Sequence, residues 1–152
     1  MSANKNTSDF IYKINDELDS VDWTRVCELF AKVAWRKRTE IEISKAFKQS
    51  SWTIFVYEGD LLIAFGRTVD DGRYYAMLAD VVVDPDYQGN GLGRYLVNTL
   101  KEKLGENYHF VNLTAAPGKG EFYKALGWKK QSTSYIWPQG PKQLRQHTDP
   151  EE

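Results

Sequence analysis

The spacing of apolar and polar positions changes along the chain, which predicts a mixture of strands and helices. Residue types that favour strands predict β-strands over Phe10–Ile14, Trp52–Tyr57, Leu61–Val69, Arg73–Val83 and Tyr108–Thr114. Polar turns at Glu58–Asp60 and Asp70–Gly72 separate three of these segments. The middle of the chain is therefore expected to form an antiparallel meander.

Apolar residues recur with helical spacing in three other segments. Asp22 is the expected N-cap of a first helix. Its apolar face carries Val26, Leu29, Phe30 and Val33. Thr39 and Glu42 have the spacing of a capping box, which begins a second helix that runs through Phe47. A third helix ends at Gly105 and carries a stripe of leucines at positions 92, 96, 100 and 104.

The last third of the chain has weaker patterns. A short helix is expected over Glu121–Leu126, and one or two strands over Trp128–Trp137. Polar composition predicts a flexible N-terminus at 1–8 and a flexible tail at 139–152. The order of the elements predicts one mixed α+β domain over residues 9–138.

Composition narrows the classes of function. The formal net charge of −1 disfavours a primary role in nucleic-acid binding. The longest apolar stretches are the length of strands, so neither a membrane span nor a signal peptide is expected, and we predict a cytoplasmic protein. Cys27 is interpreted as core packing, because nothing near it in the sequence resembles an activating base. His109 and His147 are too isolated to indicate a metal site, and none is predicted.

The most informative stretch is Asp84–Arg94, which joins a buried strand to the leucine-striped helix. Glycines at 89, 91 and 93 allow main-chain N–H groups to converge, and the helix dipole favours an anion there. The spacing is neither that of a dinucleotide-binding fingerprint nor that of a Walker loop. A glycine-rich turn without a ligand is the alternative. Three alternating glycines after a buried strand favour phosphate binding.

The same stretch resembles a known family. Gln88–Gly93 resembles the Gln/Arg-x-x-Gly-x-Gly/Ala signature of GCN5-related N-acetyltransferases (GNAT). The strand ending in Asp80–Pro85 and the later segment Phe122–Trp128 resemble two further landmarks of that family, in the same order. Together these motifs cover about residues 75–130. The resemblance implies the GNAT fold: a central, mostly antiparallel twisted sheet with helices on both faces and a splay between strands four and five.

The resemblance also implies acetyl-CoA as cosubstrate. Main-chain groups of Val81 and Val83 would pair with the pantetheine arm, in the gap between strands four and five. The pyrophosphate would be held by the main-chain amides of Gln88, Gly89, Asn90, Gly91, Leu92, Gly93 and Arg94. Ala116 departs from the family pattern, because many members carry an asparagine there that would bind the cofactor.

Acetylation of an amine needs a neutral nitrogen and a proton for the leaving thiolate. Deprotonating a lysine-like ammonium at pH 7 costs about 4–5 kcal/mol. Asp80 stands where the family often carries an acidic residue that takes this proton; the alternative is that it binds backbone at a strand irregularity. The resemblance implies that Tyr123 protonates the leaving sulfur, against the alternative of plain packing, and the Val81 amide is the candidate donor to the developing oxyanion.

The predicted function is therefore acetyl transfer from acetyl-CoA to a primary amine of a small molecule: an arylalkylamine, a polyamine or an amino sugar. Two alternatives stay open: a protein or peptide acceptor, and a non-catalytic sensor of CoA. A set of aromatic residues suggests an aromatic acceptor pocket, although such residues on strands are more often core: Trp35, Trp52, Tyr74, Tyr75, Tyr135 and Trp137. Many relatives form dimers, so a homodimer is one option.

Overall fold

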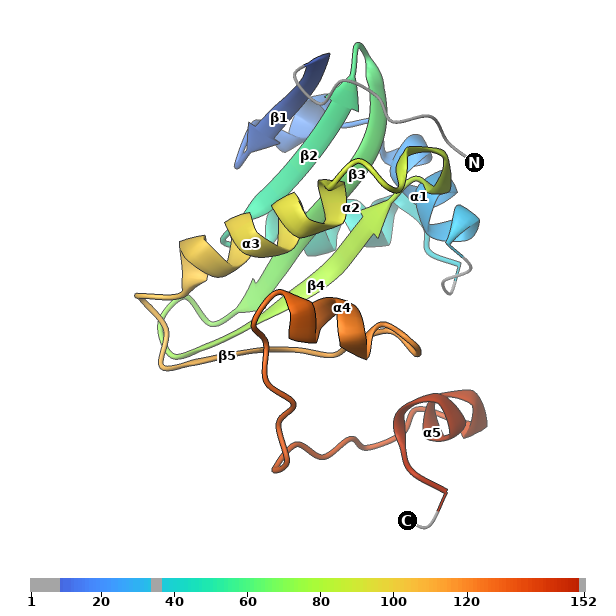
Figure 1. Cartoon of the computed structure of the whole chain (residues 1–152). Helices are drawn as coiled ribbons and strands as arrows, with labels where there is room; N and C mark the ends of the chain where they lie inside the picture. Colours follow the sequence, from blue (N-terminus) through green and yellow to red (C-terminus); the bar gives the residue numbers. More distant parts are fainter. Residues whose placement is uncertain (1–8, 34–36, 151–152) are drawn as a thin grey trace. The chain divides into compact units, whose positions relative to one another are not determined.

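The computed structural model describes residues 9–33 and 37–150, so the N-terminal segment predicted to be flexible lies outside the described residues. The chain divides into two compact units, residues 1–113 and 114–152. The predicted domain 9–138 spans the boundary between them. The first unit contains, in chain order, β1 (Phe10–Ile14), η2 (Leu18–Ser20), α1 (Trp23–Lys32), α2 (Glu40–Lys48), β2 (Thr53–Glu58), β3 (Leu61–Asp70), β4 (Tyr75–Val83), η3 (Pro85–Tyr87), α3 (Leu92–Leu104) and β5 (Phe110–Leu113) (Figure 1). The second unit contains α4 (Gly120–Ala125) and α5 (Pro141–His147).

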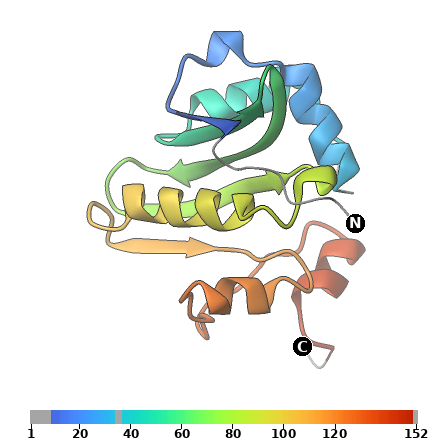
Figure 2. The same cartoon turned by 45° about the horizontal axis from the view of Figure 1, so that its top comes forward.

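The first unit is built on one sheet with strand order β1-β2-β3-β4-β5. The pairs β1–β2, β2–β3 and β3–β4 are antiparallel, whereas β4 and β5 run in the same direction (Figure 2). This arrangement confirms the predicted meander and the mixed α+β class. It also places a parallel pair at one edge of the sheet.

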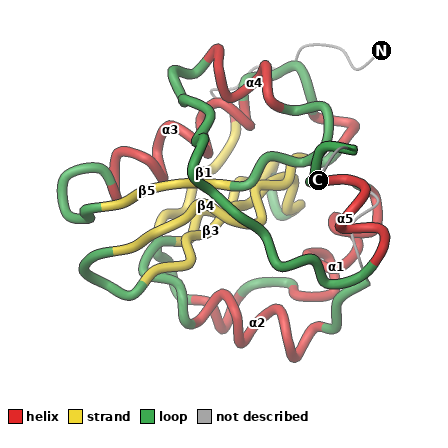
Figure 3. The backbone as a smooth tube through the Cα atoms, turned by 90° about the horizontal axis from the view of Figure 1, so that it is seen from below, coloured by secondary structure: helices red, strands yellow, loops and turns green. Residues whose placement is uncertain are grey.

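Helices cover both faces of this sheet, as consecutive residues of β3 show. Phe65 packs against Phe30 of α1 and Phe47 of α2, with ring centroids 5.1 and 5.8 Å apart. Gly66 points the other way, and a Cβ there would lie 3.1 Å from Leu100 Cδ1 of α3. Because neighbouring residues of a strand face opposite sides, α1 and α2 lie on one face and α3 on the other. Figure 3 shows α2 and α3 on opposite sides of the strands.

The predicted helix starts are confirmed in atomic detail. The Asp22 side chain accepts a hydrogen bond from the N–H of Arg25 at 3.1 Å, and Thr39 Oγ1 accepts one from the N–H of Glu42 at 3.3 Å. The leucine stripe of α3 is buried at all four positions, and Gly105 follows the helix as its C-cap. These elements form from signals a few residues apart in the sequence.

Three predictions about the elements need correction. β4 begins at Tyr75 rather than Arg73, because Asp71 Oδ1 accepts hydrogen bonds from the N–H groups of Arg73 and Tyr74 at 2.8 and 2.7 Å and holds them in the turn. Residues 128–137, all of them described, contain no strand. Residue types that favour strands need a neighbouring strand to pair with, and Tyr135 is 94% exposed. The segment predicted as a tail contains helix α5.

Candidate functional site

The parallel pair at the sheet edge separates halfway along β4. β5 pairs with Tyr75–Leu78, and in the described part of the chain no residue of β5 pairs with Ala79–Val83 (Figure 1). The second half of β4 therefore presents main-chain donors and acceptors on the side that β5 has left. Val81 and Val83, both predicted site residues, belong to this half. This confirms the predicted splay between strands four and five.

A β-bulge interrupts β4 where the splay begins. Phe65 of β3 pairs with Val82 and Arg67 pairs with Ala79, so Gly66 opposes both Asp80 and Val81. Asp80 has a φ of +53°, which is unusual for a residue other than glycine. A backbone in this region persists when its surroundings hold it. The bulge turns the buried Asp80 side chain toward two arginines.

Those two arginines bind both oxygens of the Asp80 carboxylate. Arg67 Nε lies 2.6 Å from Oδ2, and Arg38 Nη1 lies 3.0 Å from Oδ1. The Arg38 guanidinium also lies over the ring of Phe30 at 4.5 Å, and Arg67 donates to Ser50 Oγ at 3.3 Å. Through these two arginines, Asp80 links β4 to residues on both sides of α2. Arg38 precedes that helix, and Ser50, which Arg67 contacts, follows it. A proton accepted by Asp80 would remove the negative charge on which both ion pairs depend.

A second buried carboxylate, Asp84, stands at the entrance of the glycine loop. It accepts hydrogen bonds from Arg25 Nη2 at 2.6 Å, Lys32 Nζ at 2.7 Å and the N–H of Asp86 at 3.0 Å. Burial acts to raise the pKa of Asp84, but these hydrogen bonds outweigh it and hold the pKa below its usual value. The last bond caps η3, so Asp84 fixes the direction in which the chain leaves the sheet.

The glycine loop itself has the geometry of an anion site. Gly89 and Gly91 have φ values of +87° and +78°, and a Cβ at either would meet no described atom within 4 Å. Gly91 is the N-cap of α3, and as a glycine it has no side chain with which to cap the helix. The N–H groups at the start of a helix lack intrahelical acceptors, which here are those of Leu92, Gly93 and Arg94. Open space beside unpaired donors at a helix N-terminus fits a diphosphate.

The sequence-predicted residues fall in both units. The first unit brings Asp80, Val81, Val83 and the loop 88–94 onto β4 and the segment that follows it. Tyr123 belongs to the second unit, on α4, where its ring is 5.0 Å from that of Phe122. Burial raises the pKa of Tyr123, so the phenol keeps its proton at neutral pH.

Sequence reasoning missed the two arginines around Asp80. Arg38 belongs to a short basic run in the sequence, which by itself predicts only a solvated helix end. The position of Arg67 in the sequence did indicate a special role. It lies two residues after Phe65 in β3, so its charged side chain is on the face that packs against α1 and α2. A charged residue on a core-facing position requires a partner. That partner is Asp80.

Two further observations on the described residues concern membrane spans and metal sites. None of the described helices is both long and apolar enough to cross a membrane. Within the same residues, no three His, Cys, Asp or Glu side chains gather in an arrangement that could hold a metal ion.

Comparison with known proteins adds independent findings. A protein of Pyropia yezoensis named uncharacterized N-acetyltransferase ycf52 is 32% identical to this chain over 131 residues, covering 86% of the chain and 70% of the relative. Serotonin N-acetyltransferase 2, chloroplastic, of Oryza sativa subsp. japonica is 33% identical over 107 residues, covering 66% and 53%. Histone acetyltransferase TAP1 of Glycine max is 29% identical over 131 residues, covering 78% and 55%. The chain thus spans between about half and seven-tenths of the length of these relatives.

Solved structures and family models agree with the fold. A GNAT family acetyltransferase from Streptococcus pneumoniae superposes with a TM-score of 0.70 at 24% identity, over 85% of this chain and 97% of that chain. The model of the acetyltransferase (GNAT) domain matches residues 50–130, which include the bulge, the glycine loop and Tyr123. The chain therefore belongs to the GNAT family of N-acetyltransferase enzymes.

Proposed function

We propose that the protein transfers an acetyl group from acetyl-CoA to the primary amine of a small molecule, by direct attack while both are bound. The observation that carries this proposal is the run of unpaired main-chain donors at the end of a splayed strand. These donors are the N–H groups of Leu92, Gly93 and Arg94 in the first turn of α3, next to the open space at Gly89 and Gly91. A donor array at a helix N-terminus suits the pyrophosphate of CoA, and the half of β4 beyond Leu78 suits an extended, amide-containing arm.

In this proposal each predicted residue has a role at the coenzyme. Main-chain groups of Val81 and Val83 pair with the pantetheine arm, and the amides from Gln88 to Arg94 are the proposed donors to the two phosphates. Of these, the Gln88 N–H donates to Pro85 O at 3.4 Å in the structure, so it would have to exchange partners. Bound acetyl-CoA supplies an acetyl group activated as a thioester. The Val81 N–H is the proposed donor to the thioester oxygen as negative charge develops on it.

Two proton transfers complete the proposed chemistry. The amine loses a proton, for which Asp80 at the bulge is the proposed acceptor, directly or through a water molecule. A proton accepted at Asp80 Oδ1 would weaken the ion pair with Arg38, whose side chain is 33% exposed. Tyr123 Oη is the proposed donor to the leaving thiolate. Its raised pKa keeps that proton available at neutral pH.

The proposal also specifies the acceptor, which is a small molecule and not a protein. One relative is named for serotonin, a small amine, which supports a small acceptor. Another is named a histone acetyltransferase, which supports a protein or peptide acceptor as the second candidate. A non-catalytic CoA sensor is a third reading, and the presence of Tyr123 argues against it.

The cellular location of the protein stays a prediction. A cytoplasmic location was predicted from the sequence, whereas the rice relative carries the word chloroplastic in its name. A homodimer likewise stays a prediction.

A thiol-release assay tests the proposed function. The full chain is mixed with acetyl-CoA and with arylalkylamines, polyamines, amino sugars or peptides with free N-termini, and free CoA thiol is measured. Saturable turnover with small amines and none with peptides supports the proposal. Turnover with peptides alone supports the second candidate. Tight CoA binding without any turnover supports the sensor.

A further inference from the structure

The two arginines that bind Asp80 bring one more positive charge than this carboxylate needs. The Asp80 side chain is 5% exposed and carries one negative charge. Arg67 and Arg38 each carry a permanent positive charge, so one positive charge is in excess. A single arginine would neutralise the carboxylate. The second arginine therefore calls for a separate explanation.

The two arginines are held to different degrees. The Arg67 side chain is 14% exposed, and its Nε donates to Asp80 Oδ2 at 2.6 Å. Arg67 also donates to Ser50 Oγ at 3.3 Å and lies over the ring of Phe47 at 5.6 Å. Arg38 is 33% exposed, and its Nη1 lies 3.0 Å from Asp80 Oδ1. Because an ion pair weakens as it is exposed to water, Arg38 is the more easily displaced partner.

Arg38 also lines a hollow that opens between α1 and the start of α2. Its volume is about 470 Å³, within the range of pockets that hold small ligands. Glu28 of α1, Lys37 and Glu40 of α2 line it as well, and all of these residues belong to the first unit. Because the Arg38 side chain lines this hollow and its guanidinium binds Asp80, the side chain leads from the hollow to the carboxylate.

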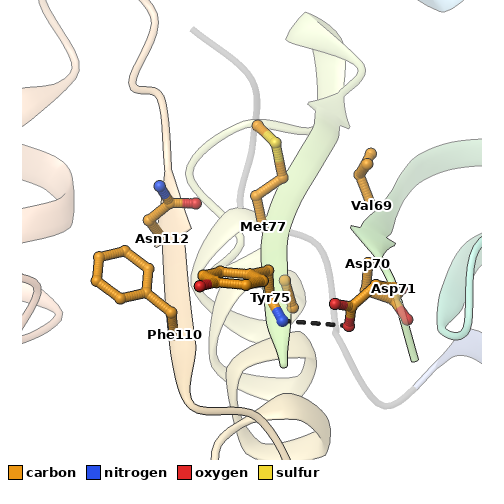
Figure 4. Close-up of a pocket in the computed structure, with 8 residues that line it drawn as sticks. Val69, Asp70, Asp71, Tyr75, Met77, Phe110 and Asn112 are labelled. Atoms are coloured by element: carbon orange, nitrogen blue, oxygen red, sulfur yellow. Dashed lines mark hydrogen bonds between the residues drawn. The ribbon is translucent and has the colours of Figure 1, made fainter. Parts of the chain in front are cut away.

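A different hollow, near the start of β4, has no such connection. It is lined by residues that include Val69, Tyr75, Met77 and Phe110 (Figure 4). Neither Asp80 nor either of its two arginines is part of that lining. The hollow between α1 and α2, by contrast, shares Arg38 with this carboxylate.

The place that the Arg38 guanidinium occupies has the features of a cation site. On one side lies Oδ1 of Asp80, 3.0 Å from Nη1. On another lies the ring of Phe30, whose centroid is 4.5 Å from the guanidinium carbon. A carboxylate oxygen and an aromatic face attract an ammonium group as they attract a guanidinium. The place therefore suits a positive charge in general, not arginine in particular.

We propose that Arg38 holds the cation position at Asp80 until the ammonium of the acceptor displaces it, so that Arg38 sets how tightly an acceptor binds. The proposal rests on the proposed acetyl transfer, which requires an amine to reach Asp80. With Arg38 at Oδ1, an ammonium approaches a cluster that already has an excess positive charge. Once Arg38 has turned away, the pair of Asp80 and Arg67 is neutral, and the ammonium takes the place of the guanidinium.

The hollow offers Arg38 another partner after it is displaced. Glu28 lines the same hollow, and its side chain is 58% exposed. The cation beside Glu28 is Arg25, at 3.5 Å, and Arg25 lies closer to Asp84, at 2.6 Å. Glu28 can therefore pair with the displaced guanidinium within the hollow.

This competition has a measurable size. A ligand that must displace a group from its site binds more weakly in proportion to the fraction of time for which the site is free. If Arg38 leaves the position for about one-tenth of the time, amines bind about tenfold more weakly than they would without Arg38. The chemistry after displacement is the same in both cases, so kcat should not depend on Arg38.

The test is the thiol-release assay with tryptamine, spermidine and glucosamine, on the wild-type chain and on Arg38→Ala. Arg38→Ala should lower the KM of every amine that is acetylated about tenfold and change kcat less than about twofold. The KM for acetyl-CoA should not change. Lys37→Ala is the matched control, because Lys37 is an exposed cation that lines the same hollow. It should change the KM for amines less than about threefold, since exposed charges are screened by solvent.

Three outcomes of this assay would show that the proposal is wrong while acetyl transfer stands. The KM for amines could stay unchanged or rise in Arg38→Ala, or kcat could fall tenfold or more, which would make Arg38 a support of the site and not a competitor. Lys37→Ala could lower KM as much as Arg38→Ala does, which would reduce the effect to the overall charge of the hollow.

A binding experiment tests the cation position without any turnover. Ethylguanidinium, which ends in the same group as Arg38, is titrated into the wild type, Arg38→Ala and Lys37→Ala, and calorimetry and thermal unfolding are followed. It should bind Arg38→Ala saturably and raise its Tm, with no such effect on the other two chains. Absence of binding to Arg38→Ala, or equal binding to all three chains, overturns the proposal. If no amine is acetylated, the proposed function fails, and this experiment alone decides on the cation position.

The wild type provides a further test that does not depend on the folding of Arg38→Ala. The side-chain ¹⁵Nε resonances of the arginines are followed by NMR while tryptamine, spermidine and glucosamine are added in turn. An amine that binds should shift the Arg38 resonance and leave that of Arg67 in place. No shift with any amine, or equal shifts of both arginines, would overturn the proposal.

Discussion

The carboxylate of Asp84, where β4 ends, lies 2.6 Å from the guanidinium of Arg25 on α1. Lys32, two turns further along the same helix, reaches the other carboxylate oxygen at 2.7 Å. The strand, the helix and the entrance of the glycine loop therefore meet at one buried carboxylate. This junction fixes where the loop leaves the sheet.

Replacing Asp84 by alanine should lower the free energy of unfolding by up to about 3–5 kcal/mol, because the largely buried Arg25 would keep only the exposed Glu28, at 3.5 Å, as an anionic partner. CoA affinity should fall as well, since the loop would lose its anchor. Urea unfolding and calorimetry measure the two effects. Asp86→Ala is the control: Asp86 is 79% exposed in its ion pair with Lys32, and its loss should cost less than about 1 kcal/mol. Equal losses in the two variants would contradict the account.

The lowered pKa of Asp84 predicts how stability depends on pH. Its folded pKa lies below the unfolded value of about 3.9, so its contribution is fully present above that value. The contribution is lost as the pH falls through the folded pKa. Urea midpoints measured between about pH 6 and pH 2.5 should therefore fall less steeply for Asp84→Asn than for the wild type. Parallel curves would show that Asp84 does not carry this stability.

Gly91 and Gly72 offer a matched pair for testing the phosphate site. Their φ values are +78° and +82°, and a Cβ at either position would meet no described atom within 4 Å. Alanine should therefore cost each a similar backbone strain, on the order of 1 kcal/mol. CoA affinity in calorimetry should fall for Gly91→Ala alone and vanish for Gly91→Glu, whose side chain and charge enter the proposed phosphate site. Equal affinities for Gly91→Ala and Gly72→Ala, or normal affinity for Gly91→Glu, would refute the placement.

Removing the phenol of Tyr123 should affect turnover without affecting coenzyme binding. Tyr123→Phe should lower kcat by about one to two orders of magnitude, which is the size expected for a general acid. CoA affinity should hold. Tyr135→Phe is the control, because Tyr135 lies in the same unit and is 94% exposed. Since burial raises the pKa of Tyr123 above about 10, kcat of the wild type should show no loss from this group between pH 7 and about 9.5. Unchanged turnover in Tyr123→Phe would remove the acid role.

The parts of the fold that were predicted correctly depend on signals within a few residues. Asp22 and Thr39 cap their helices, and the leucine stripe of α3 is buried, because each signal acts within one or two turns. The strands predicted over 128–137 failed for the opposite reason. Pairing requires a second strand, and residue type alone does not supply one.

The surroundings of Asp80 could not be predicted for a similar reason. Its ion pair with Arg67 depends on a bulge that offsets β3 against β4, and its pair with Arg38 brings together residues 42 positions apart. The sequence identified Asp80 as a candidate but carried no sign of its partners beyond the unusual position of Arg67. Family resemblance supplied the roles of the loop, and the register of β4 and β5 supplied the splay that those roles need.

The proposed function depends on main-chain amides of the glycine loop holding the diphosphate of CoA. Titration of the ¹⁵N-labelled full chain with CoA, followed by NMR, tests it most directly. The amide resonances from Gly89 to Arg94 should shift saturably with CoA and should not shift with pantetheine, which lacks the diphosphate. The resonance of Gly72 should not move in either titration. Saturable binding of CoA that leaves the amides of Gly89 to Arg94 unshifted would contradict the account.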